Sequence, residues 1–343
     1  MIERIIIENF KSIRRLELDL KPLNILIGAN GAGKSNFLSF FKLIYSTVGS
    51  RFSEYNNNID SLLYFGRKTS PYMMGEARFG GFYKISFRIV PQENSNFGFI
   101  SENNIFDSLG IKDNEHHLDP IFSSIETQRE HFNGIVYHFQ DTSKDSSMKK
   151  FADVEDNRFL NENGSNLAAY LYYIQEKYPQ ILKGIEQQIR SVASFFDHFE
   201  LAPRRLNEKE IQIEWKEKGF DSFRDGHYFS DGTLRFIALT TLLLQPNLPK
   251  AIIIDEPELG LHPFAISKLA AMMKTAAAKG SQIIVSTQSV DLVDNFEPED
   301  VIAVDRKDNE STFKRLESEE LKEWLEDYTL GDLWVKNLVG AMP

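Results

Sequence analysis

The sequence predicts an α/β fold built on a mostly parallel sheet. Two observations carry this prediction. Apolar runs at 251–254, 282–285 and 301–304 are close to continuous, as in strands that are buried on both faces of a sheet. Helical patterns at 37–44 and 263–279 follow the apolar runs Leu23–Ile27 and 251–254, so strands and helices alternate along the chain. Such alternation is typical of a parallel sheet that is covered by helices.

The remaining strands and helices follow from local pattern and helix-capping signals. A helix is expected to run from Ser165, as its N-cap, to Lys177, and Pro179 is expected to open the next helix. Further strands are expected where apolar residues alternate with polar residues or form short runs, at 1–7, 83–89, 134–140, 211–215 and 301–304.

The last part of the sequence combines an acidic helix with an apolar tail. Residues 317–326 form a helical pattern with Leu321, Trp324 and Leu325 on one side, and we expect a solvated helix that packs on the domain. The segment 328–334 is apolar enough to dock on the domain or on a partner, and the sequence leaves both alternatives open.

Composition limits the classes of protein that this sequence can represent. The chain has 343 residues, of which 42% are hydrophobic and 26% are charged, as in ordinary globular proteins. No stretch approaches the roughly 18 apolar residues of a membrane span, and the absence of cysteine excludes disulfides and thiolate metal sites. We therefore expect a cytoplasmic protein without a membrane partner. The net charge of −11 argues against a broad nucleic-acid surface, although DNA stays possible through a local groove.

Residues 28–35 match the phosphate-binding pattern G-x-x-x-x-G-K-[ST] between a predicted strand and a predicted helix. The glycines allow backbone N–H groups to surround phosphate oxygens, and the helix N-terminus adds a partial positive charge. Lys34 is expected to reach the β- and γ-phosphates, and the Ser35 hydroxyl to ligate Mg²⁺. The sequence thus predicts ATP binding by the loop residues Asn30, Gly31, Ala32, Gly33, Lys34, Ser35 and Asn36.

A second motif supplies the acidic groups that nucleotide hydrolysis needs. The apolar run 252–254 ends in Asp255 and Glu256, which is the Walker B arrangement. Asp255 is placed to hold Mg²⁺ opposite Ser35. Glu256, one residue further on, is placed to act as the general base that polarises the attacking water.

A third motif, Ser230-Asp231-Gly232, opens an apolar helix. Ser230 or Asp231 is the expected N-cap of that helix. The same geometry would offer a hydroxyl, free N–H groups and the positive end of a helix dipole to a phosphate. A capped helix start and a phosphate contact are therefore compatible roles for these residues.

Taken together, these motifs resemble those of ABC-type ATPases. Ser230-Asp231-Gly232 resembles the signature motif, 257–263 the D-loop, and 285–289 the switch segment that follows the next strand. The amino end, 7–12, and the loop 28–36 resemble the RecF, SMC and OLD-like branch of that superfamily. Three stretches, 137–143, 156–160 and 230–236, resemble compact bacterial proteins of the AAA family.

The resemblance implies an ABC-type ATPase head with a mostly parallel P-loop sheet, an antiparallel β-subdomain, a helical lobe and no coiled coil. Three regions follow from it: the P-loop half with the antiparallel β-subdomain, the mainly helical lobe with a β-hairpin, and the signature, Walker B and switch half with a short extension. Their expected bounds are 1–140, 141–225 and 226–343.

The resemblance also implies the roles of further residues. Ser230 and Gly232 of one subunit would contact the γ-phosphate that Lys34 of another subunit holds, so that two ATP molecules lie inside a homodimer. Gln140 would be the Q-loop glutamine, although a surface glutamine is an equal alternative. Gln288 occupies the switch position, where transport ATPases commonly have His, and glutamine cannot carry a positive charge, so slow turnover is expected.

The function implied is a nucleotide-timed clamp or sensor in DNA maintenance, such as DNA repair, or in antiviral defence. OLD-like nucleases carry a TOPRIM domain after the switch segment, and about 55 residues follow Gln288 here, so the nuclease is expected as a separate effector protein. Two alternatives stay open. One is the nucleotide-binding subunit of a transporter, and the other is an ATP-dependent scaffold with little turnover.

Overall fold

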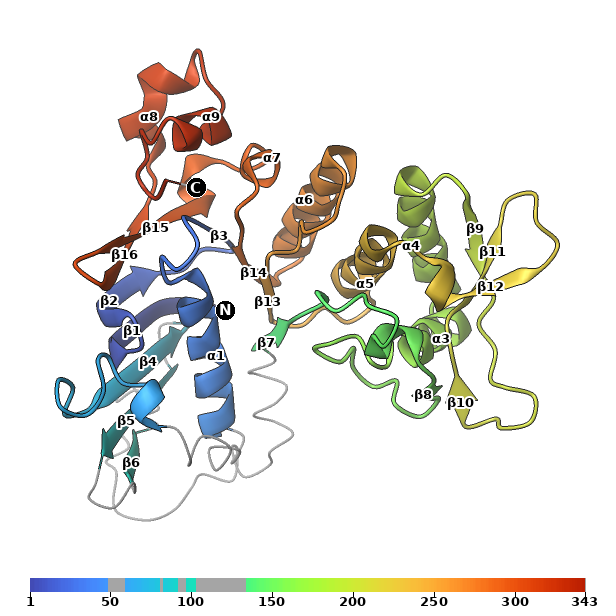
Figure 1. Cartoon of the computed structure of the whole chain (residues 1–343), viewed down its shortest axis with the longest axis horizontal. Coiled ribbons are helices and arrows are strands. Elements are labelled where there is room, and N and C mark those ends of the chain that lie inside the picture. Colours follow the sequence, from blue (N-terminus) through green and yellow to red (C-terminus); the bar gives the residue numbers. More distant parts are fainter. Residues whose placement is uncertain (49–58, 81–82, 92–96, 103–133, 343) are drawn as a thin grey trace. The chain divides into compact units, whose positions relative to one another are not determined.

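The computed structural model describes residues 1–48, 59–80, 83–91, 97–102 and 134–342, and the chain divides into two units (Figure 1). The first unit contains Met1–Val136, Pro249–Ile253 and Gly280–Pro343, and the second contains Tyr137–Leu248 and Ile254–Lys279. The division into 1–140, 141–225 and 226–343 stays a prediction.

The predicted mostly parallel sheet is confirmed. It has six strands in the order β16-β15-β3-β14-β13-β7. Strand β3 pairs in parallel with β14 and with β15, whereas β16 returns antiparallel to β15. The bounds are β3 Leu23–Ile27, β7 Gly134–Tyr137, β13 Ala251–Asp255, β14 Gln282–Ser286, β15 Val301–Lys307 and β16 Glu310–Arg315. The central strands β3 and β14 are buried almost along their whole length, which explains why most of their residues are hydrophobic.

A five-stranded antiparallel sheet completes the core of the first unit, as the sequence predicts. Its order is β2-β1-β4-β5-β6. Helix α1 (Lys34–Val48) buries Phe37, Phe40 and Phe41. Gly75 in β4 leaves room for aromatic packing, since a Cβ there would lie 2.5 Å from the Phe87 ring and 2.7 Å from the Phe40 ring. The strand bounds are β1 Ile2–Phe10, β2 Ile13–Asp19, β4 Met73–Phe79, β5 Tyr83–Pro91 and β6 Phe97–Glu102.

The carboxyl-terminal elements pack on the first unit. In α8 (Ser318–Leu325), Leu321 is buried but Trp324 is 47% exposed, so only part of the predicted apolar side is covered. In α9 (Leu330–Val335), Leu333 and Trp334 are fully buried, so the apolar tail docks on its own unit. The other short elements of this unit are η2 Ile59–Ser61, α7 Val290–Val293 and η7 Pro298–Asp300.

The second unit is mainly helical. Helices α4 and α5 pack together, as do α5 and α6. A three-stranded sheet, β12-β11-β9, lies beside them, and Trp215 of β11 stacks on Phe229 with ring centroids 4.4 Å apart. The helices are α3 Leu167–Lys177, α4 Pro179–Val192, α5 Asp231–Leu244 and α6 Pro263–Ala278. The short elements are η5 Ser147–Lys149, β8 Ala152–Asp153, β9 Phe196–Phe199, β10 Glu210–Ile211, β11 Glu214–Glu217, β12 Phe223–Asp225 and η6 Gly226–Tyr228.

Three local expectations were wrong. The N-cap of α3 is Asn166, not Ser165, and the Asn166 amide instead ties the preceding loop together by donating to the carbonyl oxygen of Phe159 at 2.7 Å. The expected strand 211–215 is two strands, because Ile211 pairs with β8 whereas Trp215 pairs with β9. Strand β7 ends at Tyr137 and not at residue 140.

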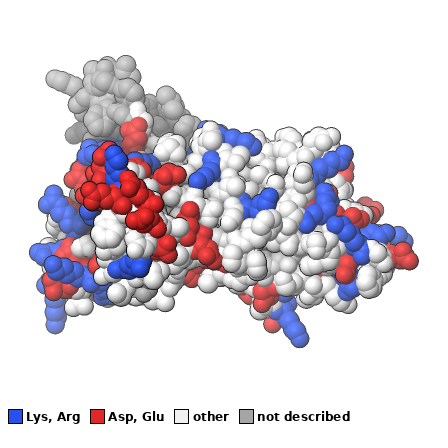
Figure 2. Space-filling model, turned by 90° about the horizontal axis from the view of Figure 1, so that it is seen from above, with Lys and Arg blue, Asp and Glu red and all other residues white. Residues whose placement is uncertain are grey.

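The face of the molecule that Figure 2 shows carries charges of both signs around a largely uncharged centre, and no broad basic tract is visible among the residues described there. None of the helices in the described part of the chain combines the length and the hydrophobicity that a membrane span requires.

Candidate functional site

The phosphate-binding loop connects β3 to α1 in the first unit. Gly28, Gly31 and Gly33 have φ angles of 147°, 79° and 122°, which residues with a side chain rarely adopt. A Cβ on Gly28 would lie 2.1 Å from the carbonyl oxygen of Val304, so the backbone of β15 leaves no space for one. Gly28 is therefore required by the packing of the loop as well as by the phosphate-binding pattern.

Two serines brace this loop from behind. The Ser311 hydroxyl of β16 donates to the carbonyl oxygen of Ala32 at 2.5 Å and lies 2.7 Å from the hydroxyl of Ser12, which follows β1. The amide of Asn36 in α1 donates to Ser12 Oγ at 2.7 Å. A Cβ on Gly33 would lie 2.1 Å from Ser311 Oγ. Ser12 belongs to the amino-terminal motif at 7–12, whereas Ser311 belongs to none of the motifs described above.

Lys34 is 5% exposed, and its ammonium lies inside the loop. It donates to the carbonyl oxygens of Gly28 and Ala29, at 3.1 Å for the latter. A buried ammonium is costly unless oxygen acceptors surround it. The phosphate oxygens of a nucleotide are acceptors of this kind, so the residues present fit a bound triphosphate.

The switch segment begins at the same edge of the sheet as the loop. Ser286 of β14 is in register with Leu26 of β3, and the backbone N–H of Thr287 donates to the carbonyl oxygen of Leu26 at 2.9 Å. Gln288 is half-buried at the next position. The first unit therefore brings Gln288 to the edge where β3 leads into the phosphate-binding loop.

The signature motif opens α5 in the second unit. Ser230 is the N-cap, and its side chain accepts from the backbone N–H of Thr233 at 3.2 Å, which decides between the two expected caps. A Cβ on Gly232 would lie 2.3 Å from the carbonyl oxygen of Gly260. The glycine of the signature motif therefore packs directly on the backbone of the D-loop.

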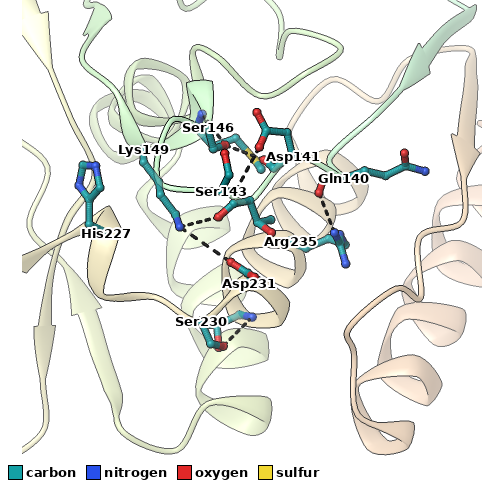
Figure 3. A network of polar contacts seen from close by, with 12 residues as sticks. Gln140, Asp141, Ser143, Ser146, Lys149, His227, Ser230, Asp231 and Arg235 are labelled. Carbon is teal, nitrogen blue, oxygen red and sulfur yellow. Dashed lines mark hydrogen bonds and ion pairs between the residues drawn. The ribbon is translucent and has the colours of Figure 1, made fainter.

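Arg235 holds its own helix and two other backbone segments together. Its guanidinium donates to the carbonyl oxygens of Phe139 at 3.0 Å and of Leu259. It also donates to the carbonyl oxygen of Gln140 at 2.9 Å (Figure 3). Burial lowers the pKa of Arg235, and the charges of Asp231 and Glu258 act in the opposite direction. An arginine is effectively always protonated, so a buried cation joins the signature helix to the Q-loop segment and to the D-loop. No motif marks this role, and the only signal in the sequence is an arginine within an apolar helix.

Asp255 and Glu256 follow β13 in the second unit. Glu256 has a φ of 47°, an uncommon value for a residue with a side chain, so the backbone turns sharply just after the strand. The side chain of Gln140 donates to the carbonyl oxygen of Asp255 at 3.3 Å. The structure thus brings Gln140 to the Walker B segment, although its Q-loop role stays a prediction.

The predicted residues divide between the units. The first unit holds the phosphate-binding loop and Gln288, and the second holds Gln140, Ser230, Gly232, Asp255 and Glu256. The first set offers N–H groups and an ammonium to phosphates. The second offers a helix N-terminus to a phosphate, and carboxylates suited to Mg²⁺ and to proton transfer.

Comparison with known proteins identifies the family. Residues 23–294 match the model of the AAA_21 family, which is described as "AAA domain, putative AbiEii toxin, Type IV TA system". The chain belongs to the AAA_21 family. This family member is 23% identical over 367 residues to the Old nuclease of Escherichia phage P2, covering 92% of the present chain but 61% of the nuclease. The chain is also similar to the energy-coupling factor transporter ATP-binding protein EcfA of Methanocaldococcus jannaschii, with 33% identity over 93 residues. This match covers 26% of the present chain and 33% of EcfA.

Solved structures show the same fold. An SmcHead bound to the C-winged helix domain of ScpA matches with a TM-score of 0.68 and 16% identity, covering 94% of this chain and 99% of that one. An Smc head domain with an extended coiled coil, bound to the C-terminal domain of ScpA from Pyrococcus furiosus, matches with a TM-score of 0.60 and 16% identity, covering 95% and 98%. Together with the family match and the similarity to the Old nuclease, this fold bears out the recognition, from the motifs, of an ABC-type ATPase of the RecF, SMC and OLD-like branch.

Proposed function

We propose that the chain binds ATP with Mg²⁺ and hydrolyses it as a homodimer that closes around two nucleotides. The observation that carries the proposal is the chain's possession of both halves of such a site. A glycine loop encloses Lys34, and Ser230 caps the N-terminus of α5, which would serve as a second phosphate-binding surface. Family membership and the SMC head fold support the ATPase assignment.

In this mechanism the first unit binds and orients the nucleotide. Lys34 and the backbone of Asn30 to Gly33 hold the phosphates, and Asn36 supports the loop through Ser12. Ser35 and Asp255 would hold Mg²⁺, which neutralises charge on the phosphates. Two protein oxygen ligands are typical of Mg²⁺ sites, where phosphates and water complete the octahedron.

Hydrolysis then requires a base and groups that orient water. Glu256 accepts a proton from the water that attacks the γ-phosphorus, while the bond from that phosphorus to the β,γ-bridging oxygen breaks and ADP leaves. Gln288 orients the water or the γ-phosphate by hydrogen bonds. Because Gln288 cannot become cationic, it adds no charge stabilisation to the transition state, and slow turnover follows.

Dimerisation completes each site. Ser230 and the N–H groups near Gly232 would face the γ-phosphate that the partner subunit's Lys34 binds, which requires a two-fold arrangement of two chains. ATP binding would close the dimer and hydrolysis would reopen it. The signature residues are then needed for assembly and turnover but not for nucleotide binding by a single chain.

The biological role we propose is a nucleotide-timed clamp or sensor in DNA maintenance or antiviral defence. Similarity to the Old nuclease over 92% of the chain supports this assignment. The chain spans 61% of that nuclease's length. The partner that we propose is an effector protein, such as a nuclease acting in trans. The mixed surface charges favour a protein partner over broad DNA contact.

The transporter subunit is the second candidate, because the EcfA match is the more identical one, at 33%. That match covers only 26% of the chain. Copurification with a membrane protein would favour the transporter. Recovery of DNA or of a protein effector on the ATP-trapped Glu256→Gln variant would favour the clamp.

Light scattering of Glu256→Gln protein with and without Mg²⁺–ATP tests the dimer directly. We expect the mass to double with ATP, and we expect either Lys34→Ala or Ser230→Arg to abolish the increase. An ATP-independent mass, or an increase that survives Ser230→Arg, would contradict the proposed sandwich. Equal steady-state turnover by wild type and Glu256→Gln would remove Glu256 from the catalytic role and favour the scaffold.

A further inference from the structure

The proposed phosphate-binding surface contains a negative charge. Asp231, the first residue of α5, stands between Ser230 and Gly232, and its side chain is 71% exposed. An acid in the first turn is favourable for an isolated helix because it complements the positive dipole end. The same carboxylate would repel the triphosphate of a second subunit, so the site needs a compensating cation.

A buried lysine supplies a cation at this point. The side chain of Lys149 is 6% exposed, and its Nζ lies 3.9 Å from Asp231 Oδ1 (Figure 3). The same Nζ donates to the carbonyl oxygen of Thr142 at 2.6 Å. A single carbonyl oxygen replaces only part of the hydration shell that a buried ammonium loses. The nearby carboxylate of Asp231 therefore also stabilises the charge of Lys149.

The position of Lys149 is fixed by a folded loop. Residues 141–149 follow Gln140 and turn back on themselves, with the Ser146 hydroxyl donating to the carbonyl oxygen of Asp141 at 2.6 Å. Met148 is 2% exposed and packs on Gly164, where a Cβ would lie 2.7 Å from Met148 Cγ. The packing of the loop therefore fixes the position of Lys149 near the start of α5, whereas an exposed lysine would be free to move.

We propose that Lys149 is a positioning residue for the phosphate-binding surface at Ser230, Asp231 and Gly232. Lys149 neutralises the charge of Asp231, so that the phosphate of a nucleotide bound to a second copy of the chain can approach this surface. This inference rests on the proposed function, since it needs the ATP-bound dimer. Arg235, one helical turn after Asp231, provides a second cation near it, but the guanidinium is already engaged by three carbonyl groups. Lys149 therefore carries the compensation.

A purely structural role makes a different prediction. If Lys149 only anchors its loop to Thr142, then Lys149→Met should impair the protein whatever residue stands at 231. If Lys149 offsets the charge of Asp231, then Asp231→Asn should restore what Lys149→Met removes. The double variant therefore separates the two roles, because only charge compensation predicts rescue.

The experiment uses full-length protein carrying Glu256→Gln and measures, by light scattering, the ATP concentration that gives half-maximal assembly. We expect Lys149→Met to raise this concentration about tenfold, and the pair Lys149→Met with Asp231→Asn to return it to within about threefold of the parent. Lys150→Met is the matched control, because it removes an equal charge from the exposed neighbouring position and should change little. Thermal unfolding of each variant reports any loss of folding.

The outcomes are distinguishable. If the double variant assembles no better than Lys149→Met, or if Lys149→Met assembles like its parent, the inference is wrong while the sandwich dimer stands. If assembly persists with Ser230→Arg, the proposed function itself fails. A Lys149→Met variant that is unstable and is not rescued in assembly by Asp231→Asn shows that the lysine only anchors the loop.

Discussion

The hydroxyl oxygens of Ser12 and Ser311 lie 2.7 Å apart behind the phosphate-binding loop, although 299 positions separate them in the chain. Ser311 also donates to Ala32, the residue before Gly33. The Ser311 hydroxyl thus contacts both the phosphate-binding loop and the turn between β1 and β2. The shape of the loop therefore depends on segments near residue 12 and near residue 311. Nucleotide affinity should therefore depend on a residue outside every known motif.

Ser311→Ala is expected to raise the KM for ATP by about fivefold, since one lost hydrogen bond is worth roughly 1 kcal/mol. The loop would lose its brace but keep Lys34, so kcat should change less than KM. Steady-state ATPase assays check this split. Thr312→Ala is the matched control, because Thr312 is the exposed neighbour on β16. An unchanged KM in Ser311→Ala would show that the brace has no role in nucleotide binding.

Gly232→Ala is expected to abolish ATP-dependent assembly while leaving ATP binding intact. The new Cβ would clash at 2.3 Å with the carbonyl oxygen of Gly260, so the signature helix and the D-loop must move apart. Binding of a fluorescent ATP analogue and light scattering measure the two properties. Gly184→Ala in α4 is the control, because nothing lies within 4 Å of its Cβ position, and there alanine should stabilise the helix by about 0.5–1 kcal/mol. Loss of analogue binding by Gly232→Ala would contradict the division of roles.

Arg235→Lys is expected to lower the free energy of unfolding by about 2–3 kcal/mol, because an ammonium cannot match the fork of donors that reaches Phe139, Gln140 and Leu259. Arg235→Met should be at least as damaging, since it leaves these carbonyl oxygens without their donor. Chemical denaturation followed by circular dichroism gives the values. If both variants unfold at the same denaturant concentration as wild type, the guanidinium does not hold these segments together.

Glu299 makes stability depend on pH near the start of α8. Hydrogen bonds with Ser318 hold the pKa of this carboxyl below its usual value, and the backbone N–H of Ser318 donates to Glu299 at 2.8 Å. A carboxyl with a lower pKa in the folded state stabilises the protein above its unfolded pKa, about 4.3, and loses that contribution as the pH falls through the folded value. Glu299→Gln should therefore lower Tm at pH 7 and bring it closer to wild type near pH 3, as measured by scanning fluorimetry. A Tm difference that grows in acid would contradict this assignment.

The sequence was most informative where local chemistry decides the structure. The loop 28–35 and the buried strands β3 and β14 could be predicted, because glycine spacing and runs of apolar residues are visible in single segments. The expected strand 211–215 failed, because its pairing depends on β8 and β9, which lie elsewhere in the sequence. Pairing partners leave no trace in the alternation of one strand.

The candidate site shows the same limit. The motifs single out Lys34, Ser230 and Asp255 as candidates, since each has a spacing that its chemistry requires. The supporting residues Ser311 and Arg235 have no such spacing, because each acts through backbone carbonyl groups far from it in the chain. Every residue has a backbone carbonyl group, so no sequence pattern distinguishes the carbonyl groups that Ser311 and Arg235 bind.

The chain passes between the two units four times, at residues 136–137, 248–249, 253–254 and 279–280. Strand β3 ends at residue 27, but both of its partners, β14 and β15, are translated only after residue 281. While the intervening residues are synthesised, the nascent chain thus carries an apolar strand that has not yet paired with its neighbours. Such late closure of the central sheet favours chaperone dependence and slow refolding, and it makes prematurely terminated chains prone to aggregate.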